Sequence, residues 1–194
     1  MDDGLVTALW RYPVAGMAGE RLRSTQVDSR GLAGDRQHVV RGPEGRLSAV
    51  DVPALASWTA TFPFNPDGAI VTEAAPPFPV IADPSGLKSW RWGDPRLGFA
   101  LERELGRTVE LVRELDVRRS VVVAATEPDV PAAVAGINIV VSLPLAGGGW
   151  SGRVLAFRDG VRLRLVSSRG DGPGIEARVI AAGRLVVGEP VALG

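Results

Sequence analysis

The stretch GLAGDRQHVV, residues 31–40, brings together three side chains that could bind or transfer charge: Asp35, Arg36 and His38. A guanidinium fork matches phosphate and carboxylate oxygens, so Arg36 is a candidate anion clamp. His38 is the single histidine of the chain. A neutral imidazole, or the Asp35 carboxylate, beside a bound anion is a candidate catalytic acid or base. If the segment is a strand, Arg36 and His38 point to the same face.

These residues also have a structural interpretation. Asp35 and Arg36 can form an internal ion pair that holds a turn, and a lone histidine is commonly packed or exposed without a catalytic role. Both interpretations stay open at this stage, as does the question of whether the chain is an enzyme. Non-covalent acid–base catalysis through His38 or Asp35 is the enzymatic route that the residues suggest.

A second candidate anion site lies in SSRGDGPG, residues 167–174. Ser167, Ser168 and Arg169, with the backbone N–H groups of this glycine-rich stretch, could form an anion-binding nest, or the stretch could be an ordinary surface turn. The tryptophans at 58, 90 and 92 fit either core packing or a lid over a ligand.

Composition narrows the partners and cofactors. The chain has 22 basic and 22 acidic residues, and Lys88 is the only lysine among the basic ones. A net charge of zero argues against a nucleic-acid partner, while the arginines suit a small anion. The lack of cysteine excludes thiolate chemistry and Cys-ligated metal, and one histidine excludes a multi-histidine metal site. Without a long apolar run or a signal peptide, we expect a cytoplasmic protein with no membrane contact.

The elements that would position these residues are mostly strands. With 24 glycines and 15 prolines, the chain suits short strands joined by tight turns. The clearest helix is 94–106, with Asp94 as N-cap, Pro95 at N1 and Gly106 at C′. The clearest hairpin is 152–166, which turns at Asp159-Gly160.

We therefore predict a mainly β fold, a β-barrel, with one or two short helices. Residues 1–93 are expected to form a β-meander lobe, and residues 94–194 the helix and a C-terminal barrel, packed as one compact unit. Less distinct patterns predict a strand at 69–74 and a short helix at 127–136.

Four stretches, in order, resemble the MOSC family, named for the C-terminal domain of molybdenum-cofactor sulfurases. LWRYPVAGMAGERL (9–22) resembles the family's opening YPVKS strand, and GLAGDRQHVV resembles its GL-x-GDR turn. GINIVVSLPLAGGGW (136–150) resembles its RPNIVV segment, and GRVLAFRDGVRLRLV (152–166) resembles the hairpin that leads to its cysteine. The resemblance implies a MOSC-like β-barrel and a molybdenum cofactor.

The same stretches differ from the family's motifs at several positions. The family's Lys-Ser pair becomes Ala15-Gly16, its arginine before the asparagine becomes Gly136, and its acidic residues before the tryptophan become glycines at 147–149. The cysteine position falls near Arg169. Molybdenum favours a thiolate ligand, so the missing cysteine argues against the cofactor.

The resemblance adds Asn138 to the candidate ligand-binding residues, because Asp35, Arg36 and Asn138 match the family's motifs. We expect a pocket that binds a small anionic ligand through Arg36, Asn138, Ser167, Ser168 and Arg169, without the family's cysteine-dependent chemistry. The alternative is a non-catalytic accessory module that binds a protein partner, or a molybdenum-cofactor carrier without a thiolate ligand.

Overall fold

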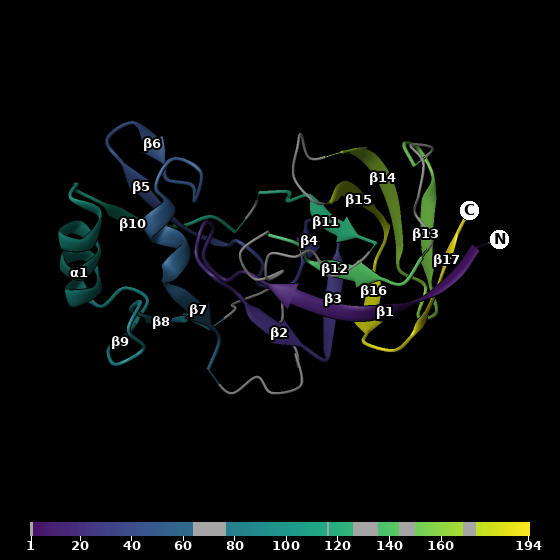
Figure 1. The fold of residues 1–194 in the computed structure, drawn as a ribbon, viewed down its shortest axis with the longest axis horizontal. Helices are drawn as coiled ribbons and strands as arrows, with labels where there is room; N and C mark the ends of the chain where they lie inside the picture. The colour runs from purple at the N-terminus through teal and green to yellow at the C-terminus, as the bar shows by residue number, and fades with distance from the viewer. Residues whose placement is uncertain (1, 64–76, 116, 126–135, 144–149, 169–173) are drawn as a thin grey trace.

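A computed structural model describes residues 2–63, 77–115, 117–125, 136–143, 150–168 and 174–194. The strands gather into a barrel at one end of an elongated molecule and a lobe with the helix at the other (Figure 1). The predictions at 69–74 and 127–136 lie outside the described residues, apart from Gly136. The prediction of a mainly β fold with a barrel and one or two short helices is confirmed.

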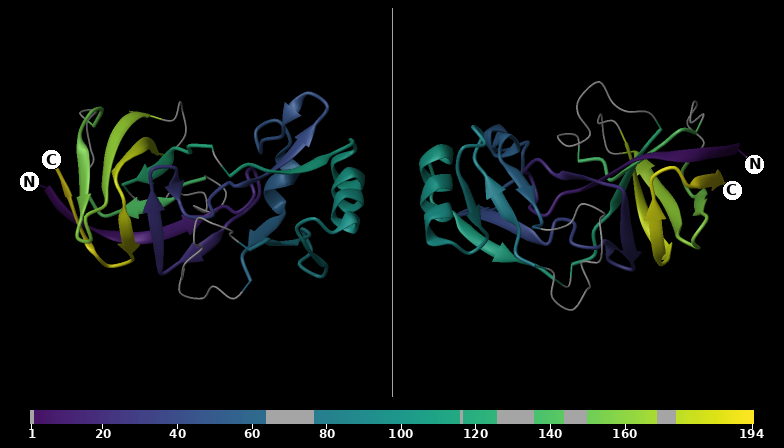
Figure 2. Two further views of the ribbon diagram at one scale, coloured as in Figure 1. Left: turned by 180° about the vertical axis from the view of Figure 1, so that it is seen from behind. Right: turned by 90° about the horizontal axis from the view of Figure 1, so that it is seen from below.

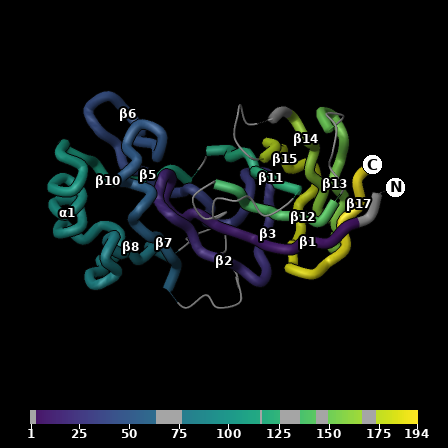
Figure 3. The backbone as a smooth tube through the Cα atoms, in the orientation of Figure 1, coloured from purple at the N-terminus to yellow at the C-terminus, as the bar shows by residue number. Residues whose placement is uncertain are grey.

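Seven strands close the barrel in the order β12-β11-β15-β14-β13-β17-β1, and β1 returns to β12. All neighbours are antiparallel except β11 and β12, which are parallel. The chain ends meet here, because Asp2 pairs with Leu193 (Figure 3). The barrel strands are β1 (Asp2–Arg11), β11 (Val121–Ala124), β12 (Ile139–Val141), β13 (Val154–Phe157), β14 (Arg162–Ser168), β15 (Ile175–Ala181) and β17 (Pro190–Leu193).

The barrel interior is filled by every second side chain of its strands. On β14, Leu163 and Leu165 are buried while Arg162 and Arg164 are exposed, as expected for strands with one face in the core. The predicted hairpin forms between β13 and β14, with Gly160 at φ 86°. Aliphatic side chains from all seven strands make the core, so the barrel presents its polar side chains outward.

The second lobe packs two small sheets and two helices around the buried Trp58 and Leu97. Asp94 caps the helix by accepting from Arg96 N, and Gly106 ends it in the left-handed conformation, as predicted. The elements of this lobe are β5 (His38–Gly42), β6 (Gly45–Arg46), η1 (Pro53–Ser57), β7 (Thr59–Thr61), β8 (Val80–Ala82), β9 (Ser89–Arg91), α1 (Pro95–Leu105) and β10 (Glu110–Arg113).

The strands between barrel and lobe complete the chain (Figure 2). β2 (Glu20–Leu22) extends the barrel sheet from β1, and a third small sheet has the order β16-β3-β4. Its strands are β3 (Ser24–Asp28), β4 (Gly31–Leu32) and β16 (Gly183–Val186).

Strand pairing brings together residues from both sides of position 93. β1 lies between β12 and β17 in the barrel, although it belongs to the N-terminal half of the sequence. The helix α1 packs with η1 and β9 in the second lobe. The chain thus starts in the barrel, builds the second lobe, and returns to finish the barrel.

Candidate functional site

The GLAGDRQ segment connects β4 to β5 through a tight turn. Gly34 has φ 78°, and a Cβ there would lie 2.8 Å from the Phe62 ring, so this position requires glycine. Arg36 has φ 50°, the only positive value of a non-glycine residue in the described chain. Because β5 begins at His38, the expected alternation of Arg36 and His38 on one strand face does not apply.

Arg36 is held by Asp35 and Asn138. Its Nε donates to Asp35 Oδ2 at 2.6 Å, and Nη2 donates to Asn138 Oδ1 at 2.6 Å and to the Ser120 carbonyl at 3.0 Å. Asn138 Nδ2 donates to Asp35 Oδ1 at 3.2 Å. The Tyr12 amide donates to the same oxygen at 2.8 Å. The structure thus brings together three of the candidate residues, and they bind one another.

This Asp35–Arg36–Asn138 network is mostly buried and joins distant parts of the chain. Asp35 and Asn138 are 2% and 0% exposed, the Arg36 side chain is 20% exposed, and Asn138 also accepts from the Val122 amide at 3.1 Å. The buried carboxylate needs these partners, because it would otherwise carry an uncompensated desolvation cost. The contacts match the structural interpretation of Asp35 and Arg36, an ion pair that fixes the turn.

His38 lies in an aromatic box and is fully buried. The rings of Phe62, Phe78 and Trp92 surround it edge-on, with centroids 6.3, 6.3 and 5.0 Å away. Its Nδ1 lies 3.2 Å from the Pro13 carbonyl oxygen, which can only accept, so Nδ1 carries the proton. Nε2 has no hydrogen-bond partner among the described residues.

This surrounding keeps the imidazole neutral. Burial lowers the pKa of His38 to about 4, and the charges of Arg113 and Arg119 act in the same direction. Its ring faces the core of the second lobe, whereas Arg36 turns toward the barrel through Asn138 and Ser120. The predicted pairing of His38 with an Arg36 clamp therefore finds no contact among the described residues.

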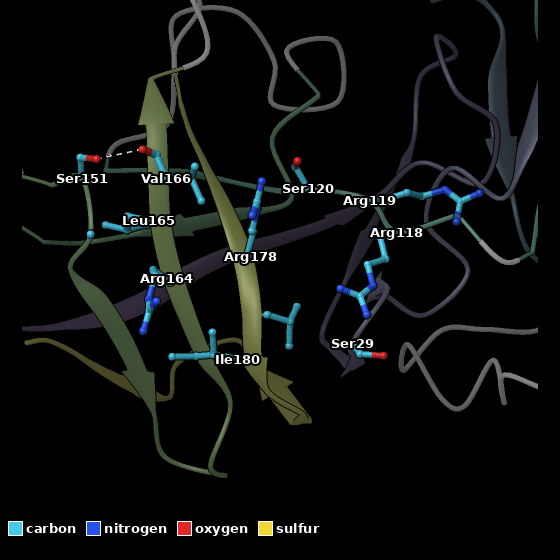
Figure 4. A pocket seen from close by; sticks show the side chains of 12 residues that line it. Ser29, Arg118, Arg119, Ser120, Ser151, Arg164, Leu165, Val166, Arg178 and Ile180 are labelled. Carbon is cyan, nitrogen blue, oxygen red and sulfur yellow. Dashed lines mark hydrogen bonds between the residues drawn. The ribbon is translucent and has the colours of Figure 1, made fainter.

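A hollow lined by polar and apolar residues lies on the outer face of the barrel, and we call it the arginine cavity. Its volume is about 700 Å³. One wall is the face of β14 and β15, and the other is the segment 118–120 together with Ser29 (Figure 4). The lining residues are Ser29, Arg118, Arg119, Ser120, Ser151, Gly152, Arg164, Leu165, Val166, Arg178, Val179 and Ile180.

Four of these lining residues are arginines, and none of them is acidic. Arg164 and Arg178 are directly opposite each other in the register of β14 and β15, and like charges at such positions destabilise a sheet. Within the described residues, Arg118, Arg164 and Arg178 form no ion pair or side-chain hydrogen bond. Their guanidinium groups are exposed and available to a ligand.

Arg119 differs from the other three arginines because its guanidinium is already bound. It donates to the carbonyl oxygens of Arg36 at 2.8 Å, of Val117 at 2.6 Å and of Glu114. Figure 4 shows this side chain pointing away from the two strands. Arg119 and Ser120 thereby link the wall of the arginine cavity to the Asp35–Arg36–Asn138 network.

Comparison with known proteins supports the family resemblance over the N-terminal part of the chain. Residues 3–82 match the family model described as the MOSC N-terminal beta barrel domain. This match confirms the predicted resemblance to the MOSC family over these residues. A search of curated proteins gave no match.

The fold of this chain is similar to that of a bacterial protein of known structure. The crystal structure of the YuaD protein from Bacillus subtilis aligns with a TM-score of 0.50 at 11% sequence identity. The alignment covers 100% of this chain and 98% of YuaD. At this identity the likeness concerns the fold alone.

The two positions where the family resemblance places a Lys-Ser pair are tightly packed. Ala15 and Gly16, which stand where the family resemblance places Lys-Ser, are respectively buried and at φ 84°. A Cβ on Gly16 would lie 2.8 Å from a methyl group of Leu55. A longer side chain at Gly16 would therefore require Leu55 to move.

The remaining candidate residues lie at the far end of β14. Ser167 and Ser168 are the last two residues of this strand, where they pair with Glu176 and Ile175, and Arg169 lies outside the described residues. No group of three or more metal-ligating side chains occurs within the described ranges. None of the described helices is long and apolar enough to cross a membrane.

Sequence reasoning missed the arginines of the cavity. The available signal was the alternation RLRL in β14, which sends Arg162 and Arg164 to one face. Such alternation is typical of any half-buried strand, and it does not reveal that Arg178 lies opposite Arg164.

Proposed function

We propose that this protein binds a small organic anion in the arginine cavity and does not carry out the cysteine-dependent cofactor chemistry of the MOSC family. The observation that carries the proposal is the juxtaposition of Arg164 and Arg178 in a cavity without an acidic lining residue. An anion between the two guanidinium groups replaces a repulsion with charge-assisted hydrogen bonds.

The lining also suggests that the anion has an apolar part. Val166, Val179 and Ile180 lie in the same cavity as the arginines, and Ile180 is 47% exposed. Binding sites combine apolar lining with a few polar groups that orient the ligand. A ligand with an anionic head and an apolar body would use both kinds of surface.

The residues at the motif positions do not fit a thiolate-bound, phosphate-bearing cofactor. Ala15 and Gly16 have no charge to offer a phosphate, and Leu55 packs closely against Gly16. The Nε and Nη2 groups of Arg36 already donate to protein oxygens. None of the 194 residues is a cysteine, so the chain supplies no thiolate for a soft metal.

Calorimetric titration with phenyl phosphate tests the proposal, because this probe has an anionic head on an apolar ring. We expect saturable binding at low ionic strength, lowered at least roughly tenfold by Arg164→Ala or Arg178→Ala, since each removes charge-assisted hydrogen bonds. Benzyl alcohol, which is neutral, should bind much more weakly.

Arg162→Ala is the matched control. Arg162 is exposed on β14, two residues before Arg164, but does not line the arginine cavity. We expect wild-type affinity in this variant. No saturable binding to the wild-type protein, or equal losses in the Arg162 and Arg164 variants, would refute the proposal.

A further inference from the structure

The arginine cavity carries free guanidinium groups on two separate walls. Arg164 and Arg178 stand on β14 and β15, whereas Arg118 extends from the segment that leads into β11. Figure 4 shows Arg118 beside Ser29, on the side of β15 that faces away from β14. Ser29 is exposed and contributes a hydroxyl donor to the Arg118 wall. The cavity thus offers two places for an anionic group.

The strand wall of the cavity also carries apolar side chains. Leu165 and Ser167 pair with the consecutive residues Ala177 and Glu176, so Val166 is the extra residue of a β-bulge. Val166 and Ile180 line the cavity, and Ile180 is exposed. Bulges re-aim side chains, and here the bulged residue adds to an apolar floor on the same wall as Arg164 and Arg178.

The size of the cavity also argues against a single inorganic ion as its full occupant. About 700 Å³ is in the range of cavities that hold organic ligands of ordinary size. One phosphate between Arg164 and Arg178 would leave Arg118 and the apolar floor without a partner.

We propose that the ligand is a linear organic dianion, with an acidic group at each end of an apolar chain. One end binds Arg164 and Arg178, the other binds Arg118 and Ser29, and the chain lies over Val166 and Ile180. This inference rests on the proposed function and adds the number and spacing of the acidic groups.

Two-point binding predicts a dependence on chain length. Once one end is bound, the second end is held close to its own site, so its binding is effectively intramolecular. A chain that is too short cannot span the walls, and one that is too long gains less. Non-specific attraction to exposed arginines would give similar affinities to all dianions of equal charge.

Calorimetric titration of the full chain with succinate, adipate, suberate and hexanoate tests the inference. We expect one dicarboxylate to bind at least roughly tenfold more tightly than hexanoate, with an optimum in chain length. In Arg118→Ala this advantage should fall to within about twofold, while hexanoate binds as it does to the wild-type protein. Arg162→Ala should keep both affinities.

The outcomes separate the two proposals. Hexanoate binding that depends on Arg164 and Arg178, with no gain for any dicarboxylate, would overturn the dianion and leave the anion-binding function in place. Equal loss of hexanoate and dicarboxylate binding in Arg118→Ala would also overturn it. If neither these acids nor phenyl phosphate binds to the wild-type protein, the anion-binding function itself is overturned.

Discussion

Acidification should destabilise the protein through His38. The imidazole is fully buried among aromatic rings, and burial lowers its pKa from 6.5 to about 4. Each unit of pKa difference between folded and unfolded states corresponds to about 1.4 kcal/mol, so the full effect on the free energy of unfolding is about 3 kcal/mol.

The direction follows from proton binding. Between about pH 6.5 and 4 the unfolded chain binds a proton at His38 that the folded chain does not, so the free energy of unfolding falls as the pH falls. Above this window both states are neutral, and below it both are protonated. The loss therefore begins near pH 6.5 and levels off below about pH 4.

His38→Asn isolates this contribution. The asparagine amide can replace Nδ1 as donor to the Pro13 carbonyl but does not titrate. We would measure urea denaturation of both proteins from pH 7.5 to 3.5 and take the difference in the free energy of unfolding. Glu20 and Glu189, whose pKa values burial raises, are the same in both proteins and cancel in the difference.

We expect this difference to change by about 3 kcal/mol across the window. A change below about 0.5 kcal/mol would show that the imidazole is hydrated in the folded protein, and the argument from the aromatic box would then be wrong. That result would also reopen the prediction of an acid–base role for His38.

Three further substitutions test other contacts by urea denaturation. Asn138→Leu should lower the free energy of unfolding by about 2–4 kcal/mol, because it leaves buried donors and acceptors unpaired. A decrease below about 1 kcal/mol would show that these hydrogen bonds do not stabilise the fold. Arg178→Glu should raise it by about 0.5–1 kcal/mol by turning the repulsion with Arg164 into an attraction, while phenyl phosphate binding is lost. Arg11→Leu should lower the free energy of unfolding by about 3–5 kcal/mol, because the carboxylate of Glu20 loses its cationic partner. In the double variant Arg11→Leu/Glu20→Leu, most of this stability should return.

Local signals were the part of the fold that the sequence could predict. The helix α1 begins at Asp94-Pro95 and ends at Gly106 because capping and proline geometry depend on a few adjacent residues. The hairpin at Asp159-Gly160 forms for a similar local reason. The placement of β1 between β12 and β17 depends on contacts across almost the whole chain, and no local pattern encodes it.

The sequence could likewise predict only one part of the candidate site. Asp35 and Arg36 were chosen from their residue types and Asn138 through the family resemblance, and the three side chains do meet in space. Their mutual hydrogen bonds could not be inferred, because spacing in the sequence does not reveal whether a guanidinium faces a ligand or a buried amide. The arginine cavity depends on strand register and on a β-bulge, both of which are set by tertiary packing.

The position of β1 has a consequence for how the protein is made. Asp2 is synthesised well before its partner Leu193, because nearly all of the described elements lie between them in the sequence. At roughly 5–20 residues per second, the first strand waits on the order of ten to forty seconds for its neighbour. During translation the edge of β1 is open to wrong pairing or to a chaperone, while the intervening lobe can already fold. Slow codons or a stalled ribosome between β1 and β17 would lengthen this vulnerable interval, so the yield of folded protein should depend on how fast the segment between these two strands is synthesised.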